Sequence, residues 1–463
     1  MKKYNKKGKT TLIVVLAFLI VVAISFMPLE KWTNGRIKDF NLISDILPDS
    51  LLPALTSGSG APEVIDPELL KAQEDAKNVA ATLDADGNPI YNDTILSEVK
   101  PSKVGENVVI EDYTTGEVGL YHLKAAIAAG RLARITVVGD SYIEGDIFTQ
   151  DLRQLLQDSY GGEGTGYVNM HSDFPGFRRS VKQGGQGWKA FSAAKKGKPE
   201  YISLSEHYFM PSGNALSSYN GVTALRHLDK WSSSRFLFIS PNNTTIMLKT
   251  TGDWKEYPVT GSPEVQQLVI DEPTGEFDVR TSDPKLIGLG VWLDGAKGIS
   301  LDCMSSRGYS GITLAKVSSN LCREMGKFVN YDLVVLEFGI NAMTASQKNY
   351  SVYANRIVEV INHVRNCYPN ADVLLLGIGD RGEKRGGVVK SMSTAPYMVE
   401  AQRDAARRAH CLFWDTREAM GGEDAIVQWS KEGLANKDYI HLTHKGGAKL
   451  AQRLYDAIQL MLK

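Results

Sequence analysis

The fold is decided by the segment RITVVGDSYIEGD, which occupies residues 134–146. It opens with a short β-branched run that stops at Gly139, and a helical pattern follows from about residue 147 to residue 159. A short apolar run that leads straight into a helix is typical of a parallel strand buried on both faces. Asp140 and Ser141 therefore stand at the carboxyl end of a strand, the edge at which open α/β sheets bind their ligands.

The C-terminal part of the chain repeats this alternation of apolar runs and helical patterns. The strand patterns cover 333–338, 373–378 and 411–414, and the helical patterns cover 353–366, 396–410 and 445–462. Continuous apolar strands separated by helices of about 10–15 residues predict a three-layer α/β/α domain with a parallel sheet. We assign residues 118–172 and 302–463 to this domain.

Residues 173–301 do not follow the alternation. Short strand patterns at 235–239, 244–248 and 267–270 are separated by turn-forming residues such as Gly252, and no long helical pattern interrupts them. Short strands at this spacing predict a β-sandwich. Because the α/β alternation resumes afterwards, we expect the sandwich to be an insertion within the α/β domain.

The beginning of the chain has the pattern of a membrane segment. Residues 1–11 contain five lysines and no acidic residue, and residues 12–29 read LIVVLAFLIVVAISFMPL. Such a run can just span a bilayer core of about 30 Å at about 1.5 Å per residue, and the lysines favour a cytoplasmic N-terminus. A cleaved signal peptide is the alternative, although its apolar region is normally shorter and ends in small residues. We expect a transmembrane signal anchor at 12–29 and an extracytoplasmic head, in a periplasm or at the cell surface.

Residues 30–117 are predicted to form an extended juxtamembrane linker. Six prolines lie between residues 45 and 105, together with the patch Ser57-Gly58-Ser59-Gly60. Apolar positions recur there without a regular period, as they do in spacers that do not pack into a core. A spacer of this kind lets a folded head reach a substrate at some distance from the membrane.

Composition bounds the remaining possibilities. The chain has 463 residues with 43% hydrophobic and 23% charged residues, which is ordinary for a globular protein of about two or three domains. The formal net charge of -1 argues against a nucleic-acid partner, because such proteins usually carry a concentrated basic excess. The cysteines form no CxxC pair and indicate neither a zinc ribbon nor a disulfide-dense scaffold. Their spacing leaves the disulfide state open for Cys303, Cys322, Cys367 and Cys411.

Two polar motifs at the predicted sheet edge have the residue types of nucleophilic catalysis. Ser141 has the position of a nucleophile, although Asp140 and Ser141 are also typical of a helix N-cap. Asp438 and His441 lie three residues apart in a turn before the last helix. A hydroxyl nucleophile needs a base within hydrogen-bond reach and a carboxylate that orients the imidazole. This pair can supply both, although a surface turn is the commoner interpretation, and we expect the nearby His444 to be a solvent-facing or supporting residue.

Two further motifs supply groups that can stabilise an oxyanion. Asn341 follows the strand pattern at 333–338, so its amide is expected at the same sheet edge, where it can donate to a developing negative charge. Gly311 lies in the segment that leads from the insertion back into the α/β domain, and its backbone N–H is a second candidate donor. Each of them is also unremarkable alone, because turns favour both residue types.

The four motifs in this order resemble the SGNH (GDSL-type) hydrolase superfamily over residues 118–172 and 302–463. The resemblance implies a flavodoxin-like α/β/α fold. A closer likeness, carried by GDSYIEGD at 139–146 and YGGEGTGY at 160–167, is to envelope-associated members with an inserted β-sandwich. Peptidoglycan O-acetylesterases with an inserted carbohydrate-binding-like module share this layout.

The resemblance also implies a role for each matching residue. Ser141 is then the nucleophile, His441 the general base and Asp438 the carboxylate that orients it. The N–H of Ser141, the N–H of Gly311 and the amide of Asn341 form the oxyanion hole. The reaction implied is acyl transfer through an acyl-serine, and it needs no metal or organic cofactor.

We therefore predict a serine esterase that removes O-acetyl groups from an envelope glycan or another polysaccharide. The runner-up is an O-acetyltransferase with the same triad, for which a membrane O-acyltransferase is a candidate partner. A lipase or thioesterase lacks support, because no long hydrophobic loop suggests an acyl tunnel, and a catalytically inactive glycan-binding anchor is the alternative from another class. Four tryptophans are candidates for stacking on sugar rings, although a core position is favoured for most of them: Trp188, Trp231, Trp254 and Trp292.

Overall fold

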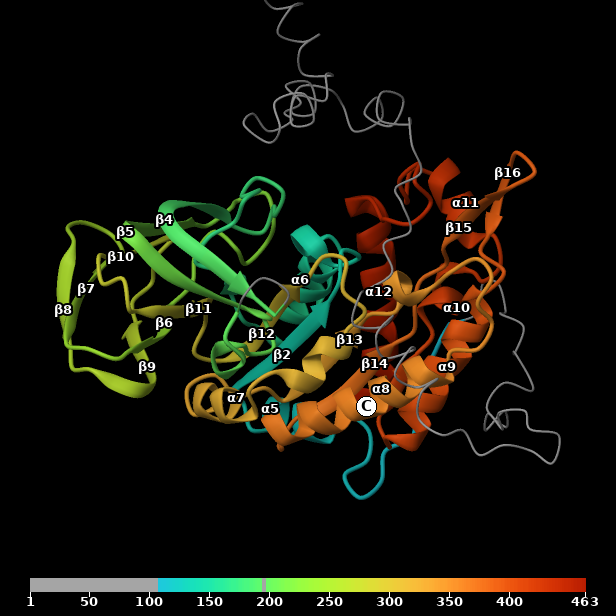
Figure 1. Ribbon diagram of the computed structural model, residues 1–463, viewed down its shortest axis with the longest axis horizontal. Helices are drawn as coiled ribbons and strands as arrows, with labels where there is room; N and C mark the ends of the chain where they lie inside the picture. Colours follow the sequence, from blue (N-terminus) through green and yellow to red (C-terminus); the bar gives the residue numbers. More distant parts are fainter. Residues whose placement is uncertain (1–106, 194–196) are drawn as a thin grey trace, which may run out of the picture. The chain divides into compact units, whose positions relative to one another are not determined.

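The computed structural model describes residues 107–193 and 197–463. Its α/β part is built on a six-stranded sheet with the order β1-β17-β14-β13-β2-β12 (Figure 1). Five of these strands run parallel, and β1 pairs antiparallel with β17. The strands are β1 (Glu111–Asp112), β2 (Leu132–Gly139), β12 (Gly298–Ser305), β13 (Leu333–Glu337), β14 (Asp372–Leu376) and β17 (Leu412–Trp414).

The sequence prediction of a purely parallel sheet is therefore corrected to a mixed sheet. The strand responsible, β1, is two residues long and shows no apolar alternation that a sequence pattern could reveal. Its pairing also places residues 107–117 in the α/β domain, although we had expected them to belong to the linker at 30–117. An antiparallel edge strand on an otherwise parallel sheet is a common arrangement in folds of this class.

Helices cover the sheet on both faces, as the alternation of patterns predicts. Every residue of β13 and β14 is buried, which requires a helix layer on each side. Helix α6 packs against α12, and α8 packs against α9. The helices are α5 (Tyr121–Ala128), α6 (Thr149–Tyr160), α7 (Ser319–Gly326), α8 (Ser351–Cys367), α9 (Ala395–Arg408), α10 (Thr416–Met420), α11 (Ala425–Lys431) and α12 (His444–Leu462).

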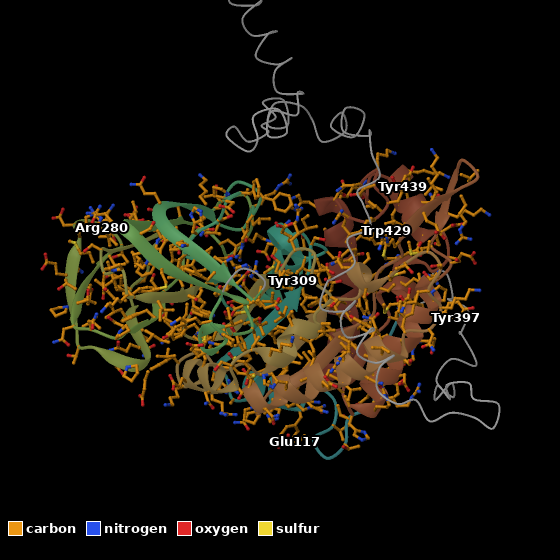
Figure 2. The ribbon with its side chains drawn as sticks, viewed as in Figure 1. Glu117, Arg280, Tyr309, Tyr397, Trp429 and Tyr439 are labelled. Carbon is orange, nitrogen blue, oxygen red and sulfur yellow. The ribbon has the colours of Figure 1, made fainter. Side chains whose placement is uncertain are left out.

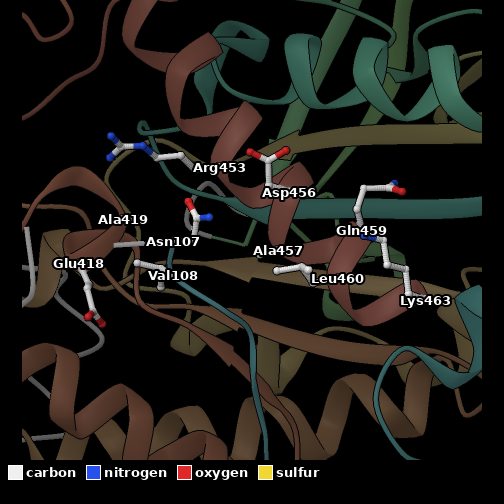
Figure 3. Close-up of a pocket in the computed structure, with 10 residues that line it drawn as sticks. All are labelled: Asn107, Val108, Glu418, Ala419, Arg453, Asp456, Ala457, Gln459, Leu460 and Lys463. Atoms are coloured by element: carbon white, nitrogen blue, oxygen red, sulfur yellow. The ribbon is translucent and has the colours of Figure 1, made fainter. Parts of the chain in front are cut away.

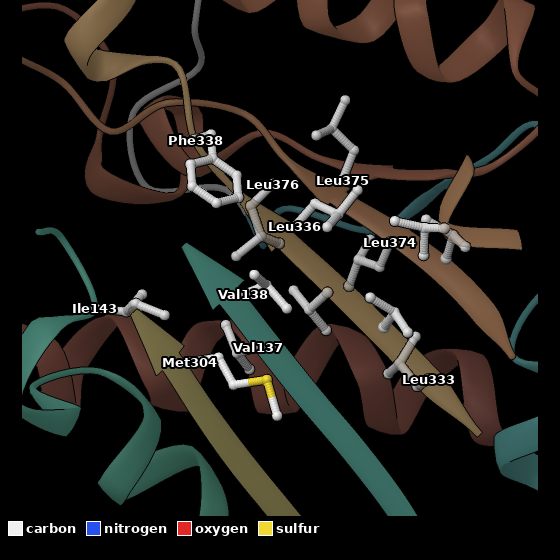
Figure 4. Packing of buried hydrophobic residues seen from close by; sticks show 14 of the residues in the cluster. Val137, Val138, Ile143, Met304, Leu333, Leu336, Phe338, Leu374, Leu375 and Leu376 are labelled. Carbon is white, nitrogen blue, oxygen red and sulfur yellow. The ribbon is translucent and has the colours of Figure 1, made fainter. Parts of the chain in front are cut away.

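The centre of the α/β core lies where β2, β13 and β14 are neighbours. Figure 4 shows the side chains at this place. Val138 is the register partner of Leu336, and Leu336 that of Leu375, so these three lie side by side on one face of the sheet, and each of them is buried. Burial of one such side chain contributes about 1.5–3 kcal/mol relative to leaving it exposed. The strand ends that follow this core are consequently held in a fixed arrangement.

The inserted part forms a β-module with a hydrophobic core of its own. We had predicted a β-sandwich here, and the structure has nine strands that are joined by antiparallel pairing into one hydrogen-bonded network. The strands are β3 (Gly166–Val168), β4 (Lys182–Ser192), β5 (His207–Asn220), β6 (Ser233–Ser240), β7 (Thr244–Lys249), β8 (Lys255–Val259), β9 (Ser262–Ile270), β10 (Glu276–Thr281) and β11 (Ile287–Asp294).

Both predicted limits of the insertion, 173 and 301, differ from the structure. Strand β3 lies before residue 173 and pairs with β11 of the module. Strand β12 begins at Gly298 and pairs along its whole length with β2 of the α/β sheet. The strand patterns alone could not show this, because they do not indicate which sheet a strand joins.

The β-module and the α/β domain share the strand β6. Phe236 and Phe238 on one face of β6 belong to the core of the module, whereas Leu237 and Ile239 on the other face belong to the core of the α/β domain. Successive side chains of a strand point to opposite faces, so one strand can line two cores. The module therefore packs on the α/β domain through apolar side chains of β6.

Within residues 107–193 and 197–463, no helix combines the length and the hydropathy that a bilayer span requires. The predicted cytoplasmic segment at 1–11 and the predicted anchor at 12–29 lie outside the described residues, as does the predicted linker up to residue 106.

Candidate active site

Ser141 lies directly beyond the carboxyl end of β2, next to the ends of β12 and β13. The turn is fixed at Asp140, whose N–H donates to the carbonyl oxygen of Glu337 at 3.3 Å. The Oγ atom of Ser141 lies 3.0 Å from Nε2 of His441, although 300 residues separate the two in the sequence. This distance allows a proton to pass from the hydroxyl to the imidazole.

Asp438 and His441 are brought together by the turn that precedes α12. The Nδ1 atom of His441 lies 2.7 Å from Oδ2 of Asp438, while Oδ1 accepts the backbone N–H groups of Ile440 and His441. Tyr439, between them, adopts a left-handed φ of 59°, and its carbonyl accepts the N–H of Gly382 at 2.8 Å. The turn is thus held in a conformation that aims the Asp438 carboxylate at His441 and the imidazole at Ser141.

The electrostatics of Asp438 suit a carboxylate that supports an imidazolium. Partial burial acts to raise the pKa of Asp438, but the hydrogen bond and the charge of His441, with two backbone N–H groups, outweigh it. The pKa of Asp438 is therefore below its ordinary value. Asp438 remains ionised at neutral pH and holds a proton on Nδ1 of His441, which leaves Nε2 free to act as the base.

The two candidate oxyanion donors, Gly311 and Asn341, lie on segments that the structure links to the residue before Ser141. Asn341 contacts Asp140 and the carbonyl of Tyr309, two residues before Gly311. Gly311 has a φ of 87°, and a Cβ atom there would come within 2.6 Å of the ring of Phe338, so only glycine fits. Among the described residues, no acceptor binds the backbone N–H of Ser141 or of Gly311. Both N–H groups remain available to a ligand oxygen.

The amide of Asn341 differs, because it already has two acceptors. Its Nδ2 atom donates to Oδ2 of Asp140 at 2.8 Å and to the carbonyl oxygen of Tyr309 at 2.9 Å. Tyr309 and Tyr439, both labelled in Figure 2, belong to the loops that carry Gly311 and His441. The structure therefore joins Ser141, His441 and Asp438 by direct contacts and links Asn341 to Asp140, while the oxyanion roles of Gly311 and Asn341 stay predictions.

Two buried acids beneath Ser141 were not predicted to matter. Asp140 is fully buried, and burial raises its pKa to about 7 although hydrogen bonds from Tyr142 and Asn341 oppose the shift. Glu337 is also buried, and burial with the nearby charge of Asp140 raises its pKa well above the ordinary value. A glutamate at the end of an otherwise apolar strand was the signal in the sequence that could have revealed this pair.

The raised pKa of Asp140 predicts a measurable pH dependence of stability. Between about pH 4 and pH 7 the folded protein retains a proton that the unfolded chain, with a pKa of 3.8, has released. The contribution of Asp140 to the free energy of unfolding therefore falls as pH rises, by at most about 1.4 kcal/mol per pH unit. Chemical denaturation across this range should show a flatter decline for Asp140→Asn than for the unmodified protein. Parallel curves would contradict the assignment.

The other candidate residues have supporting or core positions. His444 begins α12, and its Nδ1 atom lies 3.3 Å from Nε2 of Gln150 on α6, whereas Ser141 Oγ has its contact with His441. Three tryptophans are buried and cannot stack on a sugar: Trp188, Trp231 and Trp292. Trp254 is half-buried, and the guanidinium of Arg280 lies 4.2 Å from its ring centre. All four cysteines are buried and free.

A pocket of about 300 Å³ lies away from this site (Figure 3). It is lined by the C-terminal half of α12, from Arg453 onward, and by Asn107 and Glu418. Arg453 is about 14 Å along the helix axis from the start of α12, at a rise of about 1.5 Å per residue. Neither Ser141 nor His441 lines this pocket.

Comparison with known proteins supports the interpretation of the fold. Residues 295–449 match the GDSL-like Lipase/Acylhydrolase family, and this range contains Gly311, Asn341, Asp438 and His441. No curated protein matches the chain. A solved structure of a peptidoglycan O-acetylesterase is similar with a TM-score of 0.63 and 22% sequence identity, over 76% of this chain and 99% of the esterase. At this identity the likeness shows a shared fold.

Other solved structures are less similar. A protein from Bacillus subtilis has a TM-score of 0.30 and 11% identity over 60% of this chain and 90% of its own. A family two carbohydrate esterase from Cellvibrio japonicus has a TM-score of 0.26 and 10% identity over 60% of this chain and 98% of its own. Residues 295–449 are thus similar to a GDSL-like hydrolase domain, and the three-layer fold and the contacts of Ser141 with His441 and of His441 with Asp438 agree with this likeness.

Proposed function

We propose that the protein is a carbohydrate O-acetylesterase of the cell envelope. The observation that carries this proposal is the relay of two contacts, Ser141 Oγ to His441 Nε2 at 3.0 Å and His441 Nδ1 to Asp438 Oδ2 at 2.7 Å. The relay lies beside two N–H groups that are available to an oxyanion. A nucleophile, a base and an oxyanion site are the parts that transfer of an acyl group requires.

In the proposed reaction His441 removes the proton of Ser141 while Oγ attacks the acetyl carbonyl carbon. The Oγ–C bond forms, and the carbonyl oxygen becomes an oxyanion that accepts the N–H groups of Ser141 and Gly311. The bond to the sugar oxygen then breaks, and His441 returns the proton to that oxygen. His441 then takes a proton from a water molecule, whose oxygen attacks the carbonyl carbon of the acetyl-serine. The bond from this carbon to Oγ breaks, His441 returns the proton to Oγ of Ser141, and acetate leaves. Asp438 stabilises the imidazolium in both steps.

The substrate class rests on the architecture and on the proposed location. The solved peptidoglycan O-acetylesterase matches over nearly its whole length, and the present chain has a β-module inserted in the α/β domain. An anchor at 12–29 with the following head outside the cytoplasm would place the site among envelope polymers. A peptidoglycan or another O-acetylated polysaccharide is thus the proposed substrate, and acetyl the proposed acyl group.

The test is release of acetate by the full-length protein in detergent from O-acetylated peptidoglycan and, in parallel, from acetylated xylan. We expect Ser141-dependent release from at least one polymer, with free acetate as the product. Transfer of acetyl to an added polysaccharide acceptor, without free acetate, would establish the transferase instead. The absence of both activities, in a protein whose Ser141 still reacts with a fluorophosphonate, would reject a carbohydrate substrate.

The amide of Asn341 is expected to contribute to kcat as an oxyanion donor. Loss of one such donor typically costs about 3–4 kcal/mol of barrier, so Asn341→Ala should lower kcat by about 10²–10³-fold. The exposed Asn355 on α8 gives a matched control, and Asn355→Ala should leave kcat unchanged. Turnover by Asn341→Ala at the rate of the unmodified protein would remove Asn341 from the mechanism.

A further inference from the structure

The two N–H groups of the Asn341 side chain have acceptors of two kinds, one a buried side chain and the other a backbone carbonyl in a loop. A primary amide has two donors, and here one acceptor is the carboxylate of Asp140 and the other is the backbone carbonyl of Tyr309. With both acceptors in place, neither N–H is available to a substrate. An oxyanion donor at Asn341 thus requires that one of the two acceptors leave and the other stay.

Asp140 has the properties of the acceptor that stays. Its side chain is fully buried, and its Oδ1 atom accepts the N–H of Tyr142 at 2.9 Å. Its own N–H is bound to the carbonyl oxygen of Glu337, at the end of β13. The carboxylate is therefore held by the strand ends that also hold Ser141, and it cannot withdraw without disturbing the nucleophile.

Tyr309 has the properties of the acceptor that leaves. The loop is attached before Tyr309 by the bond from Ser306 N–H to Gly139 O at 2.8 Å and after it by the bond from Tyr353 OH to Ser310 O at 3.0 Å. The N–H of Tyr309 itself donates to the carbonyl oxygen of Ser306 at 3.3 Å. Between these attachments Gly308 has a φ of 82°, and no atom lies within 4 Å of the place of a Cβ there. The carbonyl can therefore turn away by a local change of the backbone, which leaves the attachments intact.

We propose that Asp140 is a positioning residue, which keeps one N–H of Asn341 bound while the oxyanion replaces the Tyr309 carbonyl on the other. The inference rests on the proposed function of this site as an acyl-transfer centre. Asp140 prevents rotation of the amide when the carbonyl of Tyr309 leaves, so the second N–H remains aimed at the reacting carbon. A donor that is fixed in advance stabilises the transition state without reorganisation at the moment of reaction.

A double-mutant cycle tests whether Asp140 acts through Asn341. The variants are Asp140→Asn, Asn341→Ala and the double variant, with kcat and KM measured on p-nitrophenyl acetate. We expect Asp140→Asn to lower kcat by about tenfold or more when Asn341 is present, with little change in KM, and by less than about twofold when Asn341 is replaced. Equal losses in the two backgrounds would overturn the proposal, because a purely structural effect does not depend on Asn341.

A matched control separates positioning from general damage. Asp372 is also a buried carboxylate that accepts two backbone N–H groups, from His122 and Leu123, but it lies at the opposite end of the sheet strands. Asp372→Asn should lower the stability and leave kcat nearly unchanged in both backgrounds. If the unmodified protein shows no Ser141-dependent hydrolysis, the proposed function fails and not merely the role of Asp140.

A crystal structure of the fluorophosphonate adduct of the full chain gives a second test that does not depend on a variant folding. The phosphoryl oxygen of the adduct represents the oxyanion. We expect Nδ2 of Asn341 to bind this oxygen and Asp140, with the Tyr309 carbonyl turned away. An adduct in which Asn341 still binds Tyr309, or has left Asp140, would overturn the proposal.

Discussion

Replacement of Ser141 by alanine is expected to lower kcat for acetate release by about 10⁴-fold or more and to abolish labelling by a fluorophosphonate. The variant removes the only atom that can form the acyl intermediate, while the oxyanion donors and substrate contacts remain and give a small residual rate. Because Ser141 is half-buried and its Oγ makes one contact, with His441, the fold should persist. Acetate release and labelling, with circular dichroism as a check of folding, measure the outcome.

Two further variants make this test specific. Ser159→Ala changes an exposed serine on α6 and should leave the rate unchanged. The double variant Ser141→Ala/His441→Ala should be no slower than Ser141→Ala alone, because the two residues act as one unit. If the second substitution multiplied the loss, His441 would have a role independent of Ser141.

Replacement of Asp146 by alanine is expected to destabilise the protein by about 3–5 kcal/mol. Asp146 is fully buried with a bidentate contact to Arg153, which is also fully buried, and it accepts further contacts from Arg178 and Ser180. Burial acts to raise the pKa of Asp146, but Arg153 and Arg178 outweigh it and hold the pKa well below its ordinary value. Removal of the carboxylate leaves the Arg153 charge unpaired inside the protein.

The midpoint of chemical denaturation measures this effect. Asp146 also has a left-handed φ of 66°, which asparagine tolerates better than alanine. If the lost charge and not the backbone conformation causes the destabilisation, Asp146→Asn should lower the free energy of unfolding nearly as much as Asp146→Ala does. The exposed Asp173, which contacts only His171 in the part of the chain described, is the control, and Asp173→Ala should change stability by less than about 0.5 kcal/mol. An Asp146→Ala variant as stable as this control would show that Arg153 finds another partner.

Much of the α/β part could be predicted from the sequence because its strands are continuous apolar runs. The run at 333–338 corresponds to β13, and the pattern at 445–462 corresponds to α12. The two-residue strand β1 could not be predicted, because its place depends on hydrogen bonds to β17 and not on a period of its own residues. The limits of the β-module were wrong for the same reason, since pairing assigns β3 and β12 to their sheets.

The candidate site was predictable to the level of single residues and not to the level of their contacts. Motif order placed Ser141, Asn341 and His441 at one sheet edge, because parallel strands end together. No residue pattern indicates that Asp140 and the carbonyl of Tyr309 both accept the Asn341 amide, since a backbone carbonyl has no sequence signature. The partners of Asp146 likewise lie at positions 153, 178 and 180, and only the fold unites them.

Because β6 lines two cores, the β-module cannot be deleted or exchanged independently of the α/β domain. Leu237 and Ile239 line the α/β core, so deletion of the β-module would expose apolar surface of the α/β domain to solvent. A short loop in place of the module could not cover this surface. Any replacement module must therefore have apolar side chains at the positions where Leu237 and Ile239 contact the α/β core. Substitutions at exposed positions of the module leave this contact unchanged, whereas substitutions on β6 require compensating substitutions in the core of the α/β domain.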